Sequence, residues 1–368
     1  MSNIETNRVL EFEGLRGFLS WWVVLDHLLL ACGFNAETLP VGIRLLARGD
    51  YAVDVFIILS GFVIFKLLTD AQETYRVFLV RRFFRLYPVF LVCLLVAAAL
   101  RPLIWSNLSH WTGNRVVLLG QRNWIDDGAH FWPYLATHLI LLHGAIPDFL
   151  LHKSASALLA PAWSISLEWQ FYLIAPLLFW FLRRNGLGGW LVFGVCVFVG
   201  SWLLHNQLEA QFFMNAFLPQ RIVFFWIGII SFYFWRECRG GGDAPAMFLV
   251  GICPLILFFT LSIPLTIWSV IMAVAMLHKG AAGRRAAAVL LAPFMQKLGR
   301  VSYSTYLGHI CCIWLLQWLI FLVLPGVSPA CMLCLLFITS VPVIYFVSCA
   351  MHCFIEVPGM RLGRRLSS

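Results

Sequence analysis

Charged side chains are scarce in this sequence of 368 residues: Lys and Arg occupy 26 positions and Asp and Glu occupy 17, together 12%. A soluble domain carries about 25% charged residues, so these side chains are too few to cover a water-exposed surface. Apolar residues make up 61% of the chain, and runs of about 20, each long enough to cross a hydrocarbon core, recur over most of its length. The composition excludes a water-soluble globule and predicts an all-α, polytopic transmembrane helical bundle.

Three further patterns are missing. Ten-residue segments of alternating polarity, typical of a membrane β-barrel, do not occur. Most of the eleven cysteines lie inside apolar runs, and Cys331 with Cys334 has no second pair or histidine cluster at zinc spacing. No small-residue cleavage site follows the first apolar run, Leu15–Cys32. We therefore expect no disulfide framework, no metal site, and a first span that is retained.

The apolar runs predict about ten spans in a single integral-membrane domain, residues 1–368, without an appended soluble domain. The predicted spans are Arg16–Gly33, Tyr51–Leu68, Leu86–Ile104, Trp163–Leu182, Leu187–Leu204, Pro219–Trp235, Ala246–Leu261, Leu265–Leu277, Val301–Leu324 and Cys331–Phe354.

Charge patterning orients these spans. Nineteen of the 26 basic residues fall on segments that share one side with the N-terminus. By the positive-inside rule we expect both termini in the cytoplasm, as in a bacterial inner-membrane protein, and the net charge of +9 needs no nucleic-acid partner. Counting Tyr134–Leu151 as another span would invert every later loop, so we expect a re-entrant or surface helix there. The outer loop Trp105–Pro133 holds four tryptophans, suited to an interfacial belt or to stacking on sugar rings.

Ionisable residues inside spans are costly and mark candidate functional sites. Arg16 begins the first span, and His27 follows eleven residues later, which places the imidazole about 16 Å deeper in the membrane. Eleven steps of 100° bring both side chains to one helix face. An interfacial anchor and a packing histidine would be the structural alternative.

Other polar residues form two groups. Arg81, Arg82 and Arg85 make a basic patch in the first inner loop, suited to phosphates, although positive-inside topology alone predicts part of this charge. In the fourth span Ser164, Glu168 and Tyr172 share one helix face near the outer boundary, where they bind a ligand or hydrogen-bond neighbouring helices. Further polar residues in or at the ends of spans are Asp54, Tyr303, Ser304, His309 and Glu356.

Taken together, the order of these motifs resembles the membrane-bound acyltransferase family 3, whose members acylate sugars and other cell-surface or secreted acceptors. The sequence departs from the family's pattern at Glu13, where Asp is frequent, at Trp169, where a second Glu is usual, and at Gly308, where an aromatic residue is common. The matching segments are Glu13–Gly17 with His27, Val53–Phe56 with Ser60–Phe62, Arg85–Pro88, Trp163–Ser164 with Glu168 and Gln170–Tyr172, Ser302–Ser304 with Tyr306, Leu307 and His309, and Glu356 with Pro358.

The resemblance implies an O-acyltransferase, most simply an O-acetyltransferase. It would take the acyl group from cytoplasmic acyl-CoA as co-substrate, with no metal, and pass it to a hydroxyl of a carbohydrate or lipid-linked saccharide acceptor. His27 would then act as a general base or as a transient acyl carrier, and Glu168 with the outer tryptophans would orient the sugar. The coenzyme phosphates would bind Arg16, Arg81, Arg82 and Arg85, with supporting roles for Asp54, Trp163, Ser164, Tyr172, Tyr303, Ser304, His309 and Glu356.

A proton-coupled transporter or flippase is the competing interpretation, with His27, Asp54, Glu168 and His309 as a proton relay. The sequence shows no inverted repeat and no paired broken helices in corresponding halves, which disfavours that class. A non-catalytic lipid-binding scaffold would leave the spacing from Arg16 to His27 unexplained.

Overall fold

The protein is helical throughout the part that the computed structural model describes, residues 9–37, 39–71, 73–111, 115–240, 262–277 and 281–368. The α-helices are α1 (Leu10–Ala31), α2 (Gly49–Ala71), α3 (Tyr75–Ala99), α4 (Arg101–Leu108), α5 (Arg115–Ala129), α6 (Phe131–Leu139), α7 (Trp163–Gln211), α8 (Leu218–Gly240), α11 (Ile263–Leu277), α12 (Ala281–Leu291), α13 (Pro293–Arg300), α14 (Ser302–Val323), α15 (Pro329–Met351) and α16 (Val357–Leu366). Short helical turns are η2 (Val41–Ala47), η3 (His143–Ala145), η4 (Ser154–Ser156), η5 (Ala160–Ala162), η6 (Phe213–Asn215) and the π-helical turn η7 (His352–Glu356).

Six helical segments within the described ranges are long and apolar enough to cross a membrane, so the predicted count of about ten spans is not confirmed. The predicted span Ala246–Leu261 lies outside the described residues, and α11, at 15 residues, is shorter than a full crossing. Helix α1 contains four charged side chains and is not among the six. The six segments are Gly49–Ala71, Tyr75–Ala99, Ala160–Leu203, Leu218–Cys238, Ser302–Val323 and Pro329–Leu366.

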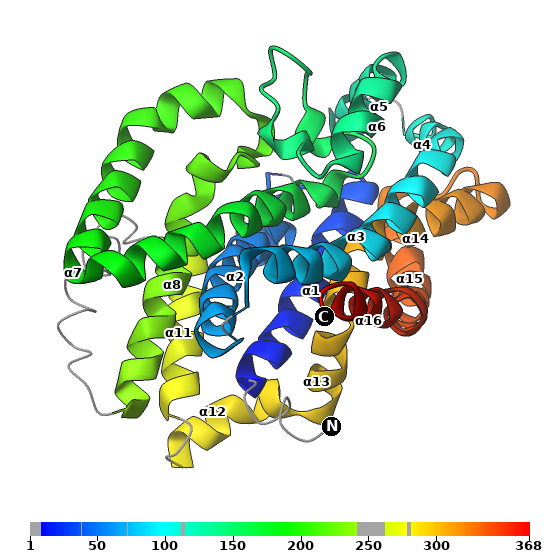
Figure 1. Ribbon diagram of the computed structural model, residues 1–368. Helices are drawn as coiled ribbons and strands as arrows, with labels where there is room; N and C mark the ends of the chain where they lie inside the picture. Colours follow the sequence, from blue (N-terminus) through cyan, green and yellow to red (C-terminus); the bar gives the residue numbers. More distant parts are fainter. Residues whose placement is uncertain (1–8, 38, 72, 112–114, 241–261, 278–280) are drawn as a thin grey trace.

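Helix α7 joins two segments that were predicted as separate spans, Trp163–Leu182 and Leu187–Leu204. Its two arms meet at a sharp bend, where Gly186 has φ +50° and ψ −142° (Figure 1). Only glycine adopts such a left-handed backbone at low cost, so the chain can reverse direction here without a separate loop.

The basic patch lies on a helix and not in a loop, which corrects the predicted boundary at Leu86. Helix α3 begins at Tyr75 because Thr74 caps it, its hydroxyl accepting a hydrogen bond from the amide of Val77 at 3.4 Å. The first three turns therefore carry Arg81, Arg82 and Arg85 against the last helix, α16, which packs alongside α3.

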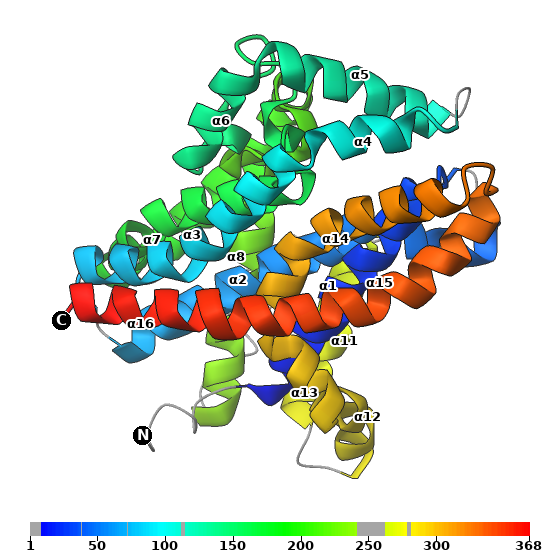
Figure 2. The same cartoon turned by 90° about the vertical axis from the view of Figure 1, so that its right-hand side faces the viewer.

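The predicted loop Trp105–Pro133 is also helical, because α4, α5 and the start of α6 occupy most of it. The predicted helix Tyr134–Leu151 is helical only up to Leu139 and then continues as turns. In both views α4, α5 and α6 lie at one end of the molecule and α12 and α13 at the opposite end (Figures 1 and 2). The tryptophan-rich segment therefore forms a helical layer over the bundle.

Glycines allow the central helices to approach closely. A Cβ on Gly61 of α2 would overlap the backbone of Phe225 in α8, and a Cβ on Gly228 of α8 would overlap that of Ile58 in α2. Likewise, a Cβ on Gly14 of α1 would overlap the backbone of Leu290 in α12. These contacts hold α1 and α2 in the core and fix the positions of the polar side chains that they carry.

Candidate active site

Two histidines from different helices meet inside the bundle. His27 of α1 and His309 of α14 have ring centroids 4.9 Å apart with an interplanar angle of 69°, and His309 is completely buried. The sequence places both at similar depth, and the structure brings them into contact.

The tautomer of each ring follows from its backbone contact. Nδ1 of His27 lies 2.9 Å from the carbonyl oxygen of Val23, and Nδ1 of His309 lies 3.1 Å from that of Thr305. A carbonyl oxygen only accepts, so each Nδ1 carries a proton, and in the neutral form of each ring Nε2 has the lone pair. The Nε2 of His309 has no hydrogen-bond partner among the described residues. The two helices therefore bring two imidazole rings together inside the bundle.

His27 also lines a cavity of about 290 Å³ between the bundle and the helical layer above it. One wall comes from α1 and α14, including Trp314 and Gln317, and the other comes from α4 and α5. The polar residues of the second wall are Arg101, Asn107, Asn123 and Asp127. The imidazole is therefore accessible to a small molecule that enters from this side.

The outer tryptophans adjoin this cavity. Trp111 and Trp124 line it, whereas Glu168 and Trp163 are not among its lining residues, so the expected sugar contacts of Glu168 and of these tryptophans do not share this cavity. Trp163 is instead buried in the hydrophobic core.

Glu168 lies in a different polar group. Its carboxylate accepts hydrogen bonds from the hydroxyl of Tyr172 and from Ser60 of α2, the latter at 3.3 Å. The ring of Trp169, the next residue, lies 5.7 Å from that of Phe83, so this part of α7 packs against α3, the helix that carries the basic patch. The sequence could not reveal this proximity, because the start of α7 and the start of α3 are far apart along the chain.

Ser164, one turn before Glu168, connects α7 to the histidine pair. The hydroxyl of Tyr306 donates to the carbonyl of Pro161 at 2.8 Å, which leaves Ser164 Oγ as the donor in its own 2.8 Å contact with Tyr306. The ring of Tyr306 packs 6.4 Å from that of His309. Ser164 and Tyr306 thus position His309 from the α7 side.

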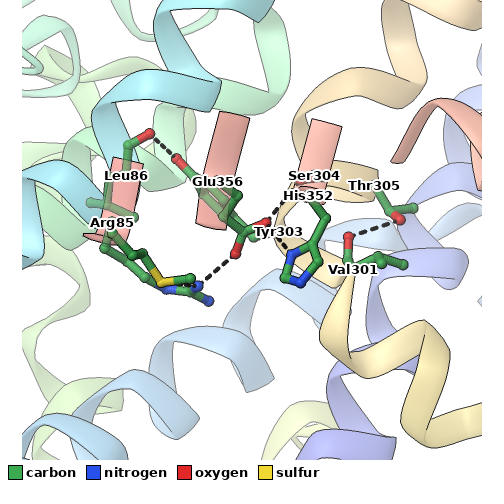
Figure 3. A network of polar contacts seen from close by, with 9 residues as sticks. Arg85, Leu86, Val301, Tyr303, Ser304, Thr305, His352 and Glu356 are labelled. Atoms are coloured by element: carbon green, nitrogen blue, oxygen red, sulfur yellow. Dashed lines mark hydrogen bonds and ion pairs between the residues drawn. The ribbon is translucent and has the colours of Figure 1, made fainter. Parts of the chain in front are cut away.

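A closed network holds the last helix against the bundle (Figure 3). The completely buried carboxylate of Glu356 accepts from Arg85 at 2.5 Å through one oxygen. Its other oxygen contacts Ser304 at 2.9 Å and His352 at 3.0 Å. Nearby, the hydroxyl of Tyr303 donates to the carbonyl of Leu86 at 2.6 Å. The π-helical turn η7 carries His352 and Glu356, and α15 and α16 continue on either side of it as one long rod (Figure 2).

The four arginines of the predicted phosphate site differ in their partners. Arg85 pairs with Glu356, and Arg81 forms an ion pair with Glu73 and donates to Ser367 at 3.0 Å. By contrast, the Nε atoms of Arg16 and Arg82 are buried with no hydrogen-bond partner among the described residues. These two guanidinium groups keep hydrogen-bonding capacity for a bound anion.

Asp54 forms an ion pair with Arg221 of α8 at 2.9 Å. Sequence reasoning missed Arg221 as a partner, and it missed Asn107 and Asp127 as residues of the cavity. The sequence gives only weak signals for these residues. Arg221 is a basic residue at the start of a predicted span, and Asn107 and Asp127 are polar residues in a segment predicted to be a loop.

Comparison with known proteins gives one family and two relatives. The family 3 profile described as "Acyltransferase domain" matches residues 9–349. Acyltransferase MdmB of Streptomyces mycarofaciens is 28% identical over 180 residues, which are 48% of this chain and less than half, 41%, of MdmB. "Putative membrane-bound transacylase BcsY" of Komagataeibacter xylinus is 27% identical over 349 residues, 91% of this chain and 80% of BcsY. No solved structure matches the chain.

The profile match and the apolar helices lead to the same class of protein. The profile extends from the start of α1 to the end of α15 and so includes both histidines and the basic patch. Six described segments have the length and composition of membrane spans. The chain is an integral-membrane enzyme, and it belongs to acyltransferase family 3.

Proposed function

We propose that the protein moves an acyl group, most simply acetyl, from cytoplasmic acyl-CoA to a hydroxyl of a carbohydrate or lipid-linked saccharide acceptor. The membrane would be the bacterial inner membrane, with both termini in the cytoplasm. The observation that carries this proposal is the contact between His27 and His309, where a basic nitrogen lies beside a cavity large enough for part of an acceptor.

The reaction breaks the thioester bond of the donor and forms an oxygen ester on the acceptor. The acceptor oxygen attacks the thioester carbonyl carbon, and its proton passes to Nε2 of His27. The C–S bond then breaks, and coenzyme A leaves as the thiol with that proton. If His27 carries the acyl group instead, Nε2 attacks the thioester carbon, the C–S bond breaks and coenzyme A leaves as the thiolate. The acceptor hydroxyl then attacks the acyl-imidazolium, the C–N bond breaks to regenerate the imidazole, and the hydroxyl proton passes to the thiolate.

The donor would bind from the side of Arg16. Arg16 lies on the same helix as His27, eleven residues earlier, which corresponds to about 16 Å along the axis. That span suits a donor whose phosphates bind at one end and whose thioester reaches the imidazole at the other. Arg82 offers a second unpaired guanidinium nitrogen for phosphate, and guanidinium groups match phosphate geometry through paired hydrogen bonds.

A labelled-acetyl experiment separates this function from transport. Purified protein in proteoliposomes is given acetyl-CoA with a radioactive acetyl group, together with the saccharide-containing envelope fraction of the native host. The proposal predicts base-labile label in the saccharide fraction and an equal amount of free coenzyme A. Saccharide movement across the vesicle membrane with no ester formed would instead support the transporter interpretation.

A further inference from the structure

We infer that the cavity beside His27 holds one sugar ring of a saccharide acceptor, and that Asn107 and Asp127 are the residues that hydrogen-bond its hydroxyls. The inference rests on the proposed acyl transfer and deepens it, because it assigns the acceptor to the helical layer formed by α4 and α5.

The size of the cavity fits such a ligand. At about 290 Å³ it lies at the small end of ligand-binding sites, which run from about 300 to about 1,000 Å³. One sugar ring fits in this volume, whereas coenzyme A, with its nucleotide, diphosphate and pantetheine arm, does not.

Asn107 contributes an unpaired acceptor. Its side chain is only 5% exposed, and its Nδ2 donates to the carbonyl of Trp314 at 2.9 Å, which fixes the orientation of the amide. Its Oδ1 is buried with no hydrogen-bond partner among the described residues. Because an unsatisfied buried acceptor is costly, a ligand hydroxyl that donates to this oxygen would stabilise the complex.

Asp127 contributes a carboxylate with spare capacity. Its Oδ2 accepts from the amide of Leu158 at 3.1 Å, and Nη1 of Arg101 lies 3.8 Å away, beyond hydrogen-bond distance. A carboxylate accepts about four hydrogen bonds, so positions remain for ligand hydroxyls. Burial raises the pKa of Asp127 to about 6, which leaves the group mainly ionised near neutral pH.

Aromatic side chains complete the site and make it rigid. Trp111, Trp124 and Trp314 line the cavity, and their apolar surface suits the C–H groups of a sugar ring. Arg101 donates to the carbonyl of Trp124 at 3.0 Å, and the indole of Trp124 donates back to the carbonyl of Arg101 at 2.9 Å. This reciprocal pair locks α4 to α5, so the wall is formed before a ligand arrives.

Steady-state kinetics with three variants test the inference. Asp127→Asn keeps an oxygen for the Leu158 amide but loses the charge, Asn107→Leu removes the unpaired oxygen, and Ser156→Trp fills the cavity. Acyl transfer from acetyl-CoA to the envelope saccharide fraction is measured in nanodiscs, and thermal unfolding identifies the variants that fold. We expect the acceptor KM to rise at least about tenfold in Asp127→Asn, with the donor KM within about twofold of wild type.

The control is Asp126→Asn, the same chemical change one residue away at a side chain that does not line the cavity. Its acceptor KM should stay within about twofold of wild type. An unchanged acceptor KM in every folded variant, or an increase confined to the donor KM, would overturn the inference. If wild type itself transfers no acyl group to the fraction, the proposed function fails, and this outcome differs from transfer that is insensitive to the cavity variants.

Discussion

Two polar regions of this bundle differ in how completely their hydrogen bonds are satisfied. Around Glu356 both carboxylate oxygens have partners, from Arg85 on one side and from Ser304 and His352 on the other. Around His27 the Nε2 of His309 and the Oδ1 of Asn107 are buried without a partner in the described part of the chain. Native proteins pair nearly all buried polar groups with the chain, a water or a ligand, so the second region offers hydrogen-bond acceptors to a ligand and the first does not.

The two regions use the same kinds of polar side chain for different roles, one in folding and one in the proposed activity. The closed network joins α3, α14 and the last helix, and its value is structural. The open region leaves these two atoms unpaired, at a cost to stability, and the proposed acyl transfer takes place beside them. A substitution in the closed network should therefore act mainly on folding, and one in the open region mainly on activity.

His27→Ala should have the largest effect. General acid–base steps contribute about 10²- to 10⁴-fold, so acyl transfer should fall by that factor while the unfolding midpoint stays close to that of wild type. His130→Ala removes an exposed imidazole at the residue before α6 and serves as the matched control. Residual activity within a few-fold of wild type would assign His27 a packing role.

Glu356→Ala should act on folding. Removing one partner of a buried ion pair costs about 3–5 kcal/mol, because the other charge is left unpaired, and we expect the free energy of unfolding to fall by that amount. Asp50→Ala breaks the exposed pair with Arg48, whose side chains are 49% and 38% exposed, and should cost at most about 1 kcal/mol. Activity lost at unchanged stability in Glu356→Ala would contradict the structural role of the network.

Arg16→Lys should raise the donor KM by about tenfold, because an ammonium cannot reproduce the paired hydrogen bonds of guanidinium to phosphate. Initial rates at varied acetyl-CoA measure this effect, and Arg48→Lys, a change at an exposed residue, is the control. An unchanged donor KM in Arg16→Lys would place the phosphates elsewhere.

The pH dependence of acceptor binding should give the smallest effect. The pKa of Asp127 is about 6, raised mainly by burial, although the Leu158 amide and Arg101 lower it. Below that pH the carboxyl is protonated and accepts fewer hydrogen bonds, so the acceptor KM should rise as the pH falls from about 7 to about 5. Asp127→Asn should remove most of this rise. A wild-type acceptor KM that is flat over this range would show that ionised Asp127 does not bind the acceptor.

The sequence predicts how deep a residue lies along its own helix better than it predicts which residues of other helices contact it. Helix geometry alone places Arg16 and His27 on one face of α1, and His309 at a similar depth in the ninth predicted span. The ion pair between Arg85 and Glu356 joins residues 271 positions apart, and no spacing rule reveals it. The contact of Glu168 with Ser60, 108 positions away, is hidden for the same reason.

Helix boundaries were hardest to predict where polar residues interrupt apolar runs. The apolar criterion started the third span at Leu86, although the Thr74 cap starts α3 eleven residues earlier, at Tyr75. It also interpreted Trp105–Pro133 as a loop, because α4 and α5 are short and partly polar. The sequence therefore does not show that α4 and α5 form one wall of the cavity, although it marks the tryptophans of this segment as possible sugar contacts.

The most direct test of the central claim is a structure of the protein with a non-transferable acetyl-CoA analogue, in which a methylene group separates the acetyl carbonyl from sulfur. We expect the diphosphate beside Arg16 and the carbonyl carbon next to Nε2 of His27, at the boundary of the cavity. Room for one hydroxyl oxygen between carbon and nitrogen would indicate a general base, whereas direct contact at about 3–3.5 Å would indicate an acyl carrier. A carbonyl bound away from both His27 and the cavity would contradict the account.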